Sequence, residues 1–188
     1  MNTPEMEALR AFRQQVDPLF GCRRDALFEA RDAVLSAPPL ETPAHLSLAP
    51  PCGGRWGSLD EALNAGSRDL ARLERLAASS PLEPQTTWFA VDARVWPRWE
   101  AETSPDRGVS HHPYRHSHGP PSVAGWNSSW LVPVPGRCSS WTAPLRVRRI
   151  LPAENRNLLA AAQIRSWLGQ VGPLATGARG PVFTFDAG

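Results

Sequence analysis

Residues 87–98 read TWFAVDARVWPR, and this stretch decides the fold that we expect. Residues 88–91 are a short apolar run rich in aromatic and β-branched side chains, which predicts a buried strand with Asp92 directly after it. The pattern returns near the other end of the chain, where residues 181–185 (PVFTF) lead into Asp186. If the two strands are neighbours in one sheet, both carboxylates emerge at the same edge, where they can share a divalent cation.

The stretches between the two aspartates predict the rest of a sheet. Residues 122–132 and 140–150 are β-rich, and turn signals at residues 133–136 favour their antiparallel pairing. Residues 155–171 have the apolar pattern of a helix, whereas residues 100–122 indicate a long polar connection. A parallel return to the first strand needs a helical crossover. The order strand, strand, strand, helix, strand therefore predicts an α/β fold with a ribonuclease-H-like mixed sheet over residues 86–188.

Residues 1–80 predict a small helical region in front of that sheet, with a role in packing or DNA binding. Thr3 is a candidate N-cap for a first helix that ends at residues 17 and 18 (Asp-Pro), a second helix covers residues 23–35, and residues 37–56 indicate a loop. Ser58 and Glu61 have capping-box spacing and open a short helix that Gly66 ends, and Ser67 starts a longer one. Two short helices around a glycine resemble a helix-turn-helix, but we favour a hairpin with its leucines on a core, because residues 58–91 are acidic.

The composition is that of a globular protein, with 41% hydrophobic and 20% charged residues. All 20 basic residues are arginines; residues 1–91 hold 9 of them against 12 acids, and residues 92–188 hold 11 against 6, so the second half is the better candidate for binding a polyanion. Cys22, Cys52 and Cys138 are too widely spaced for a zinc site or a disulfide framework. No signal peptide or membrane-spanning run is apparent, which predicts a cytoplasmic protein.

Several separate motifs resemble one family. They are AVDARVWPRWEAETSPDRG (residues 90–108), AGWNSSW (124–130), SWTAPLRVRR (140–149) and FTFDAG (183–188), preceded by RRDALFEARDAVL (23–35), PAHLSLAP (43–50) and GSLDEALNAG (57–66). Together they resemble transposases of the DDE endonuclease superfamily in bacterial insertion sequences, of the actinobacterial type. The resemblance extends over nearly the whole chain.

This resemblance implies a metal-dependent DNA transposase. Asp92 and Asp186 match the first and second catalytic acids, which bind Mg²⁺ or Mn²⁺, and the partner is DNA at transposon ends. A polar motif, with Arg98, Thr103, Ser104 and Arg107, is expected to face DNA. DDE enzymes take a third carboxylate from a later helix, and this chain stops at residue 188. We therefore expect a truncated form that alone neither cleaves nor joins DNA, and that has exposed apolar surface. The alternatives are a non-catalytic fragment that binds DNA or pairs with a transposase and so acts as an inhibitor, and a decayed relic. Besides DNA, the possible partners are further copies of this chain in a homo-oligomer and a full-length transposase.

Three other patterns leave alternatives open. Four histidines, His111, His112, His116 and His118, could form a zinc site, but we favour a solvated loop.

Of the eight tryptophans, Trp88 and Trp167 fit core positions, and Trp96, Trp99, Trp126, Trp130 and Trp141 could stack on flipped bases, although we favour core packing for them too. Arg146 and Arg148 share one strand face by the two-residue period, which is either an exposed phosphate-binding face or a merely solvated one.

Overall fold

The structure is a computed structural model, and it describes residues 3–36, 42–53, 55–79, 86–111, 122–134, 142–171 and 180–185. The chain divides into two compact parts, residues 1–76 (unit 1) and residues 77–188 (unit 2). Among the residues described, no helix has the length and apolar character needed to cross a bilayer.

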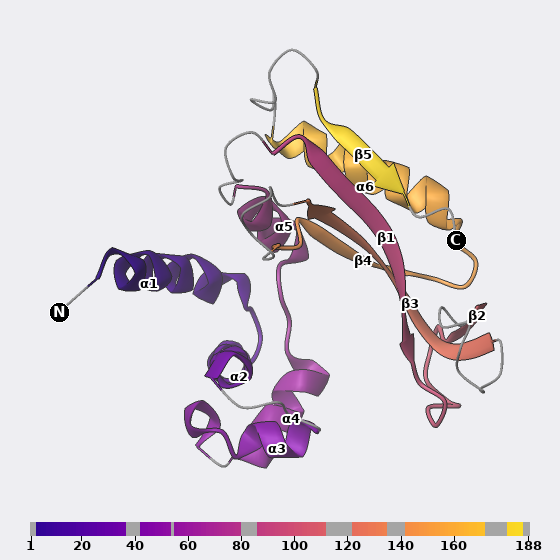
Figure 1. The fold of residues 1–188 in the computed structure, drawn as a ribbon. Coiled ribbons are helices and arrows are strands. Elements are labelled where there is room, and N and C mark those ends of the chain that lie inside the picture. Colours follow the sequence, from indigo (N-terminus) through magenta and orange to yellow (C-terminus); the bar gives the residue numbers. More distant parts are fainter. Residues whose placement is uncertain are drawn as a thin grey trace. The chain divides into compact units, whose positions relative to one another are not determined.

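Unit 1 is built of short helices (Figure 1). The first begins as predicted, because the Thr3 side chain accepts a hydrogen bond from the backbone N–H of Met6 and Pro4 occupies the first turn. The helices are α1 (Pro4–Val16), η1 (Asp17–Leu19), α2 (Arg24–Ser36), α3 (Pro43–Ser47), η2 (Pro50–Cys52), α4 (Trp56–Ala65) and α5 (Leu70–Ala78), the last of which continues into unit 2.

The predicted loop at residues 37–56 is only partly a loop. It contains α3 and η2, and Thr42 caps α3 by accepting a hydrogen bond from the N–H of His45 at 3.2 Å. Of the prolines that indicated a loop, Pro43, Pro50 and Pro51 are in fact first-turn residues of these two short helices, where the missing N–H costs nothing.

The predicted capping box is wrong, because α4 begins at Trp56 and Ser58 lies inside the helix. Its end at Gly66 is confirmed, with the N–H of Gly66 donating to the carbonyl of Ala62 at 2.9 Å. The start of α5 at Ser67 is also wrong. Asp69 caps that helix by accepting from the N–H of Arg72 at 2.8 Å, whereas the Ser67 hydroxyl accepts from the N–H of Cys22.

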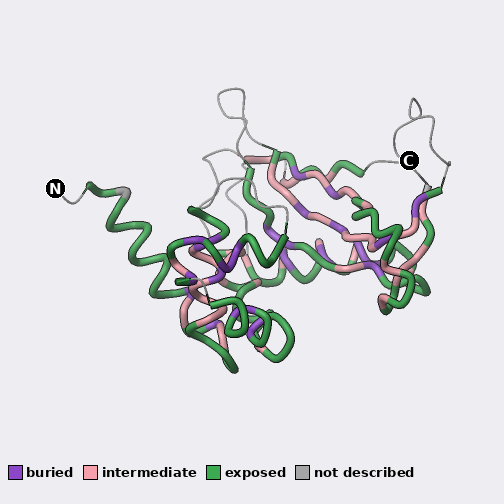
Figure 2. Tube along the Cα trace, turned by 90° about the horizontal axis from the view of Figure 1, so that it is seen from below, coloured by how far each residue is buried: buried purple, intermediate pink, exposed green. Residues whose placement is uncertain are grey.

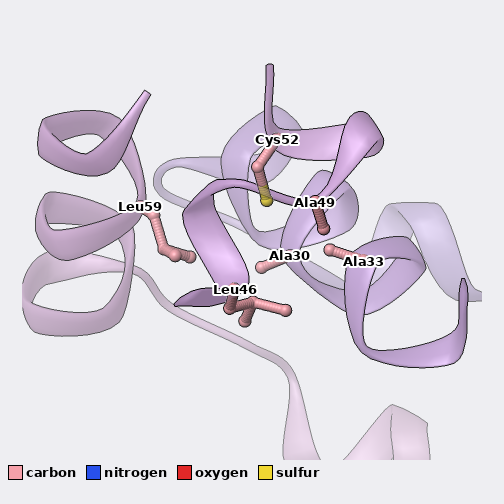
Figure 3. Packing of buried hydrophobic residues seen from close by; sticks show 6 residues of the cluster. All are labelled: Ala30, Ala33, Leu46, Ala49, Cys52 and Leu59. Carbon is pink, nitrogen blue, oxygen red and sulfur yellow. The ribbon is translucent and has the colours of Figure 1, made fainter. Parts of the chain in front are cut away.

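A small apolar cluster holds unit 1 together (Figure 3). It joins α2, α3, η2 and α4 through Ala30, Ala33, Leu46, Ala49, Cys52 and Leu59. The predicted hairpin with leucines of both helices on a core is wrong for α5, because Leu70 and Leu73 are exposed. The α4 helix packs instead on α2 and α3.

The described residues of unit 2 form a mixed five-stranded sheet and one long helix (Figure 1). The elements are β1 (Trp88–Pro97), β2 (Gly108–His111), β3 (Ser122–Pro133), β4 (Arg146–Ile150), α6 (Arg156–Val171) and β5 (Val182–Phe185). Strand β1 is central, antiparallel to β3 on one side and parallel to β5 on the other, and β3 also pairs antiparallel with β2 and β4. The predicted ribonuclease-H-like mixed sheet is confirmed.

Helix α6 is the crossover that the parallel return requires. The side-chain oxygen of Asn155 caps it by accepting from the backbone N–H groups of Asn157 and Leu158. Trp167 is fully buried, with its ring 4.9 Å from that of Phe89, and the surrounding core includes Val91 and Leu131. Figure 2 shows buried positions alternating with less buried ones along the strands, as expected for a sheet covered on one face.

Strand β2 was not predicted. Residues 100–122 were expected to form a long polar connection, yet residues 108–111 pair with residues 122–125 of β3. Strand β3 has twelve residues and β4 covers only five of them, so the backbone of its first part would otherwise lack hydrogen-bond partners on that edge.

Candidate metal centre on strand β1

Asp92 lies in the middle of β1, at the point where the neighbouring strand stops. The prediction that Asp92 directly follows a strand is wrong, because β1 continues to Pro97. Pairing with β5 runs from Trp88 opposite Val182 to Val91 opposite Phe185. Asp92 is therefore the first residue of β1 beyond this pairing, and Asp186, which follows Phe185 in the sequence, lies outside the described residues.

Strand alternation places Asp92 on the sheet face away from α6. Phe89, Val91 and Leu131 pack with Trp167 of α6, and the buried Ser129 hydroxyl donates to the side-chain oxygen of Gln163 in α6 at 2.5 Å. Successive side chains of a strand point to opposite faces, and directly paired residues share a face. We call the other side of the sheet the Asp92 face; on β1 and β3 it carries Asp92, Arg94, Trp96, Trp126, Ser128 and Trp130.

The Asp92 carboxylate is accessible and only weakly paired. Its side chain is 44% exposed, and its Oδ2 atom lies 3.7 Å from Nε of Arg94, which is more exposed still. An ion pair in such an exposed position contributes little to stability. Carboxylate oxygen is the donor that Mg²⁺ and Mn²⁺ prefer, so Asp92 fits a metal ligand. Within the described part of the chain, no three His, Cys, Asp or Glu residues gather closely enough to hold a metal.

A family model described as DDE superfamily endonuclease matches residues 15–188. The chain belongs to this family. DDE superfamily endonucleases act on DNA and generally use divalent metals, which agrees with an accessible carboxylate on the central strand of the sheet. No curated protein and no solved structure matches the chain.

Two of the arginines predicted to bind DNA in this DDE endonuclease lie in the segment between β1 and β2. Arg98 is exposed, and its guanidinium carbon lies 5.5 Å and 5.7 Å from the ring centroids of Trp96 and Trp126. Arg107 instead donates from Nη1 to the backbone carbonyls of Arg98 and Trp99, each at 3.0 Å. It therefore holds the segment after β1 in place, and its contact with DNA stays a prediction.

Arg146 and Arg148 share one strand face, as predicted, but the prediction that this face is exposed is wrong for Arg146. Arg146 pairs with Leu131 in the sheet and is only 7% exposed, because it lies among the core residues on the α6 side. Arg148 pairs with Ser129, is exposed, and binds Glu154 with a distance of 3.1 Å between Nη2 and Oε1. Both are on the face opposite Asp92.

Arg149 is the arginine of β4 that shares the Asp92 face, and sequence reasoning missed it as a site residue. It pairs with Ser128, and its guanidinium lies 4.7 Å from the ring centroid of Trp126. The two-residue period puts Arg149 on the opposite face from Arg146 and Arg148. Only the register of β4 with β3, and of β3 with β1, shows that the face of Arg149 is the one that carries Asp92.

The tryptophan predictions divide in the same way. Core packing is confirmed for Trp167 and wrong for Trp88, Trp96 and Trp99, which are exposed. Trp126 and Trp130 are partly buried. The described structure does not include Trp141, Cys138, or the histidines at positions 112, 116 and 118, and for His111 it gives the strand position alone, so the zinc alternative stays a prediction.

Proposed function

We propose that this DDE endonuclease is a DNA transposase of an insertion sequence, in which Asp92 and Asp186 hold Mg²⁺ or Mn²⁺. The observation that carries this proposal is the register of the two parallel strands, in which Val91 lies opposite Phe185. Each of these residues immediately precedes one of the aspartates. If the register continues by one residue, the aspartates become direct neighbours.

The dimensions of a sheet support a shared cation. Neighbouring strands lie about 4.8 Å apart, and Mg²⁺ binds oxygen at about 2.1 Å, so two adjacent carboxylates can reach one ion from both sides. The end of β5 leaves that side of Asp92 uncovered by any further pairing among the described residues.

In this proposal, the bound metals supply Lewis-acid stabilisation of charge on the phosphodiester oxygens during DNA strand cleavage and transfer. The protein's own part is to position them. Asp92 is fixed by pairing with Trp130 in the middle of the sheet, and the exposed Arg98 on the same face contacts a phosphate of the DNA. Two carboxylates hold metal loosely, so efficient catalysis needs a third one from outside the described residues. We further propose that the reaction takes place in the cytoplasm, because the proposed substrate is DNA.

Metal binding tests the proposal without depending on activity. We expect Mn²⁺ to broaden the amide NMR signals of residues around Asp92, such as Ala93 and Trp130, and we expect Asp92→Asn to abolish this broadening. The control is Asp106→Asn, because Asp106 is also an exposed acid of unit 2, and asparagine tolerates its left-handed backbone, with φ of 56°. Broadening that survives in Asp92→Asn, or that centres on Asp106, contradicts the proposal.

A second function is DNA binding, or pairing with a full-length transposase, without cleavage. The exposed Arg98 beside the rings of Trp96 and Trp126 supports it, because such a cation can pair with a phosphate whether or not a metal is bound. Salt-dependent binding to inverted-repeat DNA with no nicking in Mg²⁺ would support this function. Nicking of plasmid DNA that is lost in Asp92→Ala would support the enzyme.

A further inference from the structure

Two tryptophans and two arginines form a connected surface on the Asp92 face. Trp96 of β1 pairs directly with Trp126 of β3, Arg98 lies within 6 Å of both ring centroids, and Arg149 lies 4.7 Å from that of Trp126. We call these four residues the Trp–Arg surface. Trp96 is 63% exposed, so a large aromatic side chain is offered to solvent beside the guanidinium of Arg98.

Hydrogen bonds hold two side chains of this surface and the backbone of a third residue in position. The indole N–H of Trp126 donates to the carbonyl of Pro105 at 3.2 Å, and Nη2 of Arg149 donates to the same oxygen at 2.6 Å. The backbone N–H of Arg98 donates to the carbonyl of Ala124 at 2.8 Å, which extends the pairing of β1 with β3 past Pro97. Side chains fixed in this way lose little conformational entropy when a ligand binds.

The charges on this face suit an anionic ligand. This face carries the arginines Arg94, Arg98 and Arg149 and the carboxylate of Asp92. Asp106 adds a further carboxylate at the margin, 3.9 Å from Arg149. A divalent cation at Asp92 would add to the positive charge. Polyanions that also carry flat rings are nucleic acids, whose bases stack on aromatic side chains and whose phosphates pair with arginine.

We propose that the Trp–Arg surface binds an unpaired nucleotide of the DNA strand held at Asp92. The base stacks on Trp96, and Arg98 and Arg149 contact the adjoining phosphates. Trp96 follows Asp92 by four residues on the same face, which is about 13 Å along a strand, or about four nucleotides of a B-form strand. The identity of the polymer as DNA rests on the proposed function, whereas the stacking site rests on the geometry of the four side chains.

Trp88 provides a matched control. It precedes Asp92 by four residues on the same face of β1 and is 52% exposed, but within the described structure its ring has no arginine stacked against it. A site that merely attracts apolar or aromatic ligands should use both tryptophans, whereas the Trp–Arg surface should use Trp96 alone.

The test is the affinity of the full chain for a fluorescein-labelled single-stranded oligonucleotide, measured by anisotropy in EDTA. We expect Trp96→Ala to weaken binding about 5-fold to 150-fold, equivalent to the roughly 1–3 kcal/mol of one base–aromatic stack. Trp96→Phe should keep part of the affinity, Arg98→Ala should reduce both the affinity and its salt dependence, and Trp88→Ala should bind as the unchanged chain does. Circular dichroism of each variant establishes that it is folded.

The inference is overturned if Trp88→Ala and Trp96→Ala lose the same affinity for the oligonucleotide. It is also overturned if blunt duplex binds as tightly as single strand and Trp96→Ala weakens the binding of both equally. Unchanged binding in Trp96→Ala would overturn it as well. These outcomes are separate from the metal test, because oligonucleotide binding is measured in EDTA on the Trp96 and Trp88 variants, whereas the metal test follows Mn²⁺ broadening in Asp92→Asn. If Asp92→Asn abolishes the Mn²⁺ broadening but Trp96→Ala binds the oligonucleotide as the unchanged chain does, the proposed function stands. Only the Trp–Arg surface is then refuted.

Discussion

Gly125 is the position where the sheet under the Trp–Arg surface tolerates no side chain. It pairs with Pro97 of β1 and Gly108 of β2, and a Cβ atom added there would lie 2.1 Å from the carbonyl oxygen of Trp96 and 3.1 Å from Cα of Pro97. Ordinary contact begins at about 3.4 Å, so the Gly125→Ala variant must move the β1 backbone by about 1.3 Å. Overpacking typically costs 1–3 kcal/mol, and we expect about 3 kcal/mol here because backbone, rather than a flexible side chain, must yield.

Urea unfolding followed by circular dichroism measures this loss, which corresponds to a fall of about 6–12 °C in Tm. Gly169→Ala is the matched control, because Gly169 lies within α6 with open space around it. There the same substitution should raise the free energy of unfolding by about 0.5–1 kcal/mol, since alanine favours the helix. If Gly125→Ala unfolds at the urea concentration of the unchanged chain while Gly169→Ala behaves as expected, the close approach of β1 and β3 is refuted.

Two further predictions concern the cores of the two units. Trp167→Ala should lower the free energy of unfolding by about 3–5 kcal/mol, because the ring is fully buried beneath the sheet, and a loss below about 1 kcal/mol in urea unfolding would contradict that packing. In unit 1, burial, with a smaller effect from the carboxylate of Glu29, raises the pKa of the Cys52 thiol, so less reactive thiolate is present at pH 8 and labelling should speed up only at higher pH. Mass spectrometry should show iodoacetamide on the exposed Cys22 well before Cys52, and equal native rates would refute the burial.

Apart from β2, the order of the elements along unit 2 was predictable because its signals are local. The apolar run before Asp92, the β-rich stretch at residues 122–132 and the helix over residues 155–171 each follow from short-range pattern, and the rule that a parallel return needs a crossover assembles them. The parallel pairing of β1 with β5 was the main prediction of this kind, and it is confirmed.

The faces of the sheet were not predictable, because they depend on register between strands far apart in sequence. The period of β4 shows that Arg146 and Arg148 share a side, but it does not show that this side lies over the core with Leu131. The same limit explains why core packing was wrongly predicted for Trp96, since its sequence neighbours do not show which face of the sheet it lies on. Strand β2 was missed for a related reason, since its four residues gain their hydrogen bonds from the long β3 and not from any strong local preference.

The alternation of β1 has an evolutionary consequence. Odd-numbered residues such as Phe89 and Val91 build the core, and even-numbered residues from Asp92 to Trp96 carry the chemistry that we propose. Deletion of one codon within this strand would move every later residue to the other face of the sheet. A carboxylate would then point into the core and an apolar side chain into solvent, so folding and metal binding would fail together. Loss of two codons would preserve parity. Functional descendants of this gene should therefore vary the length of this strand only in steps of two.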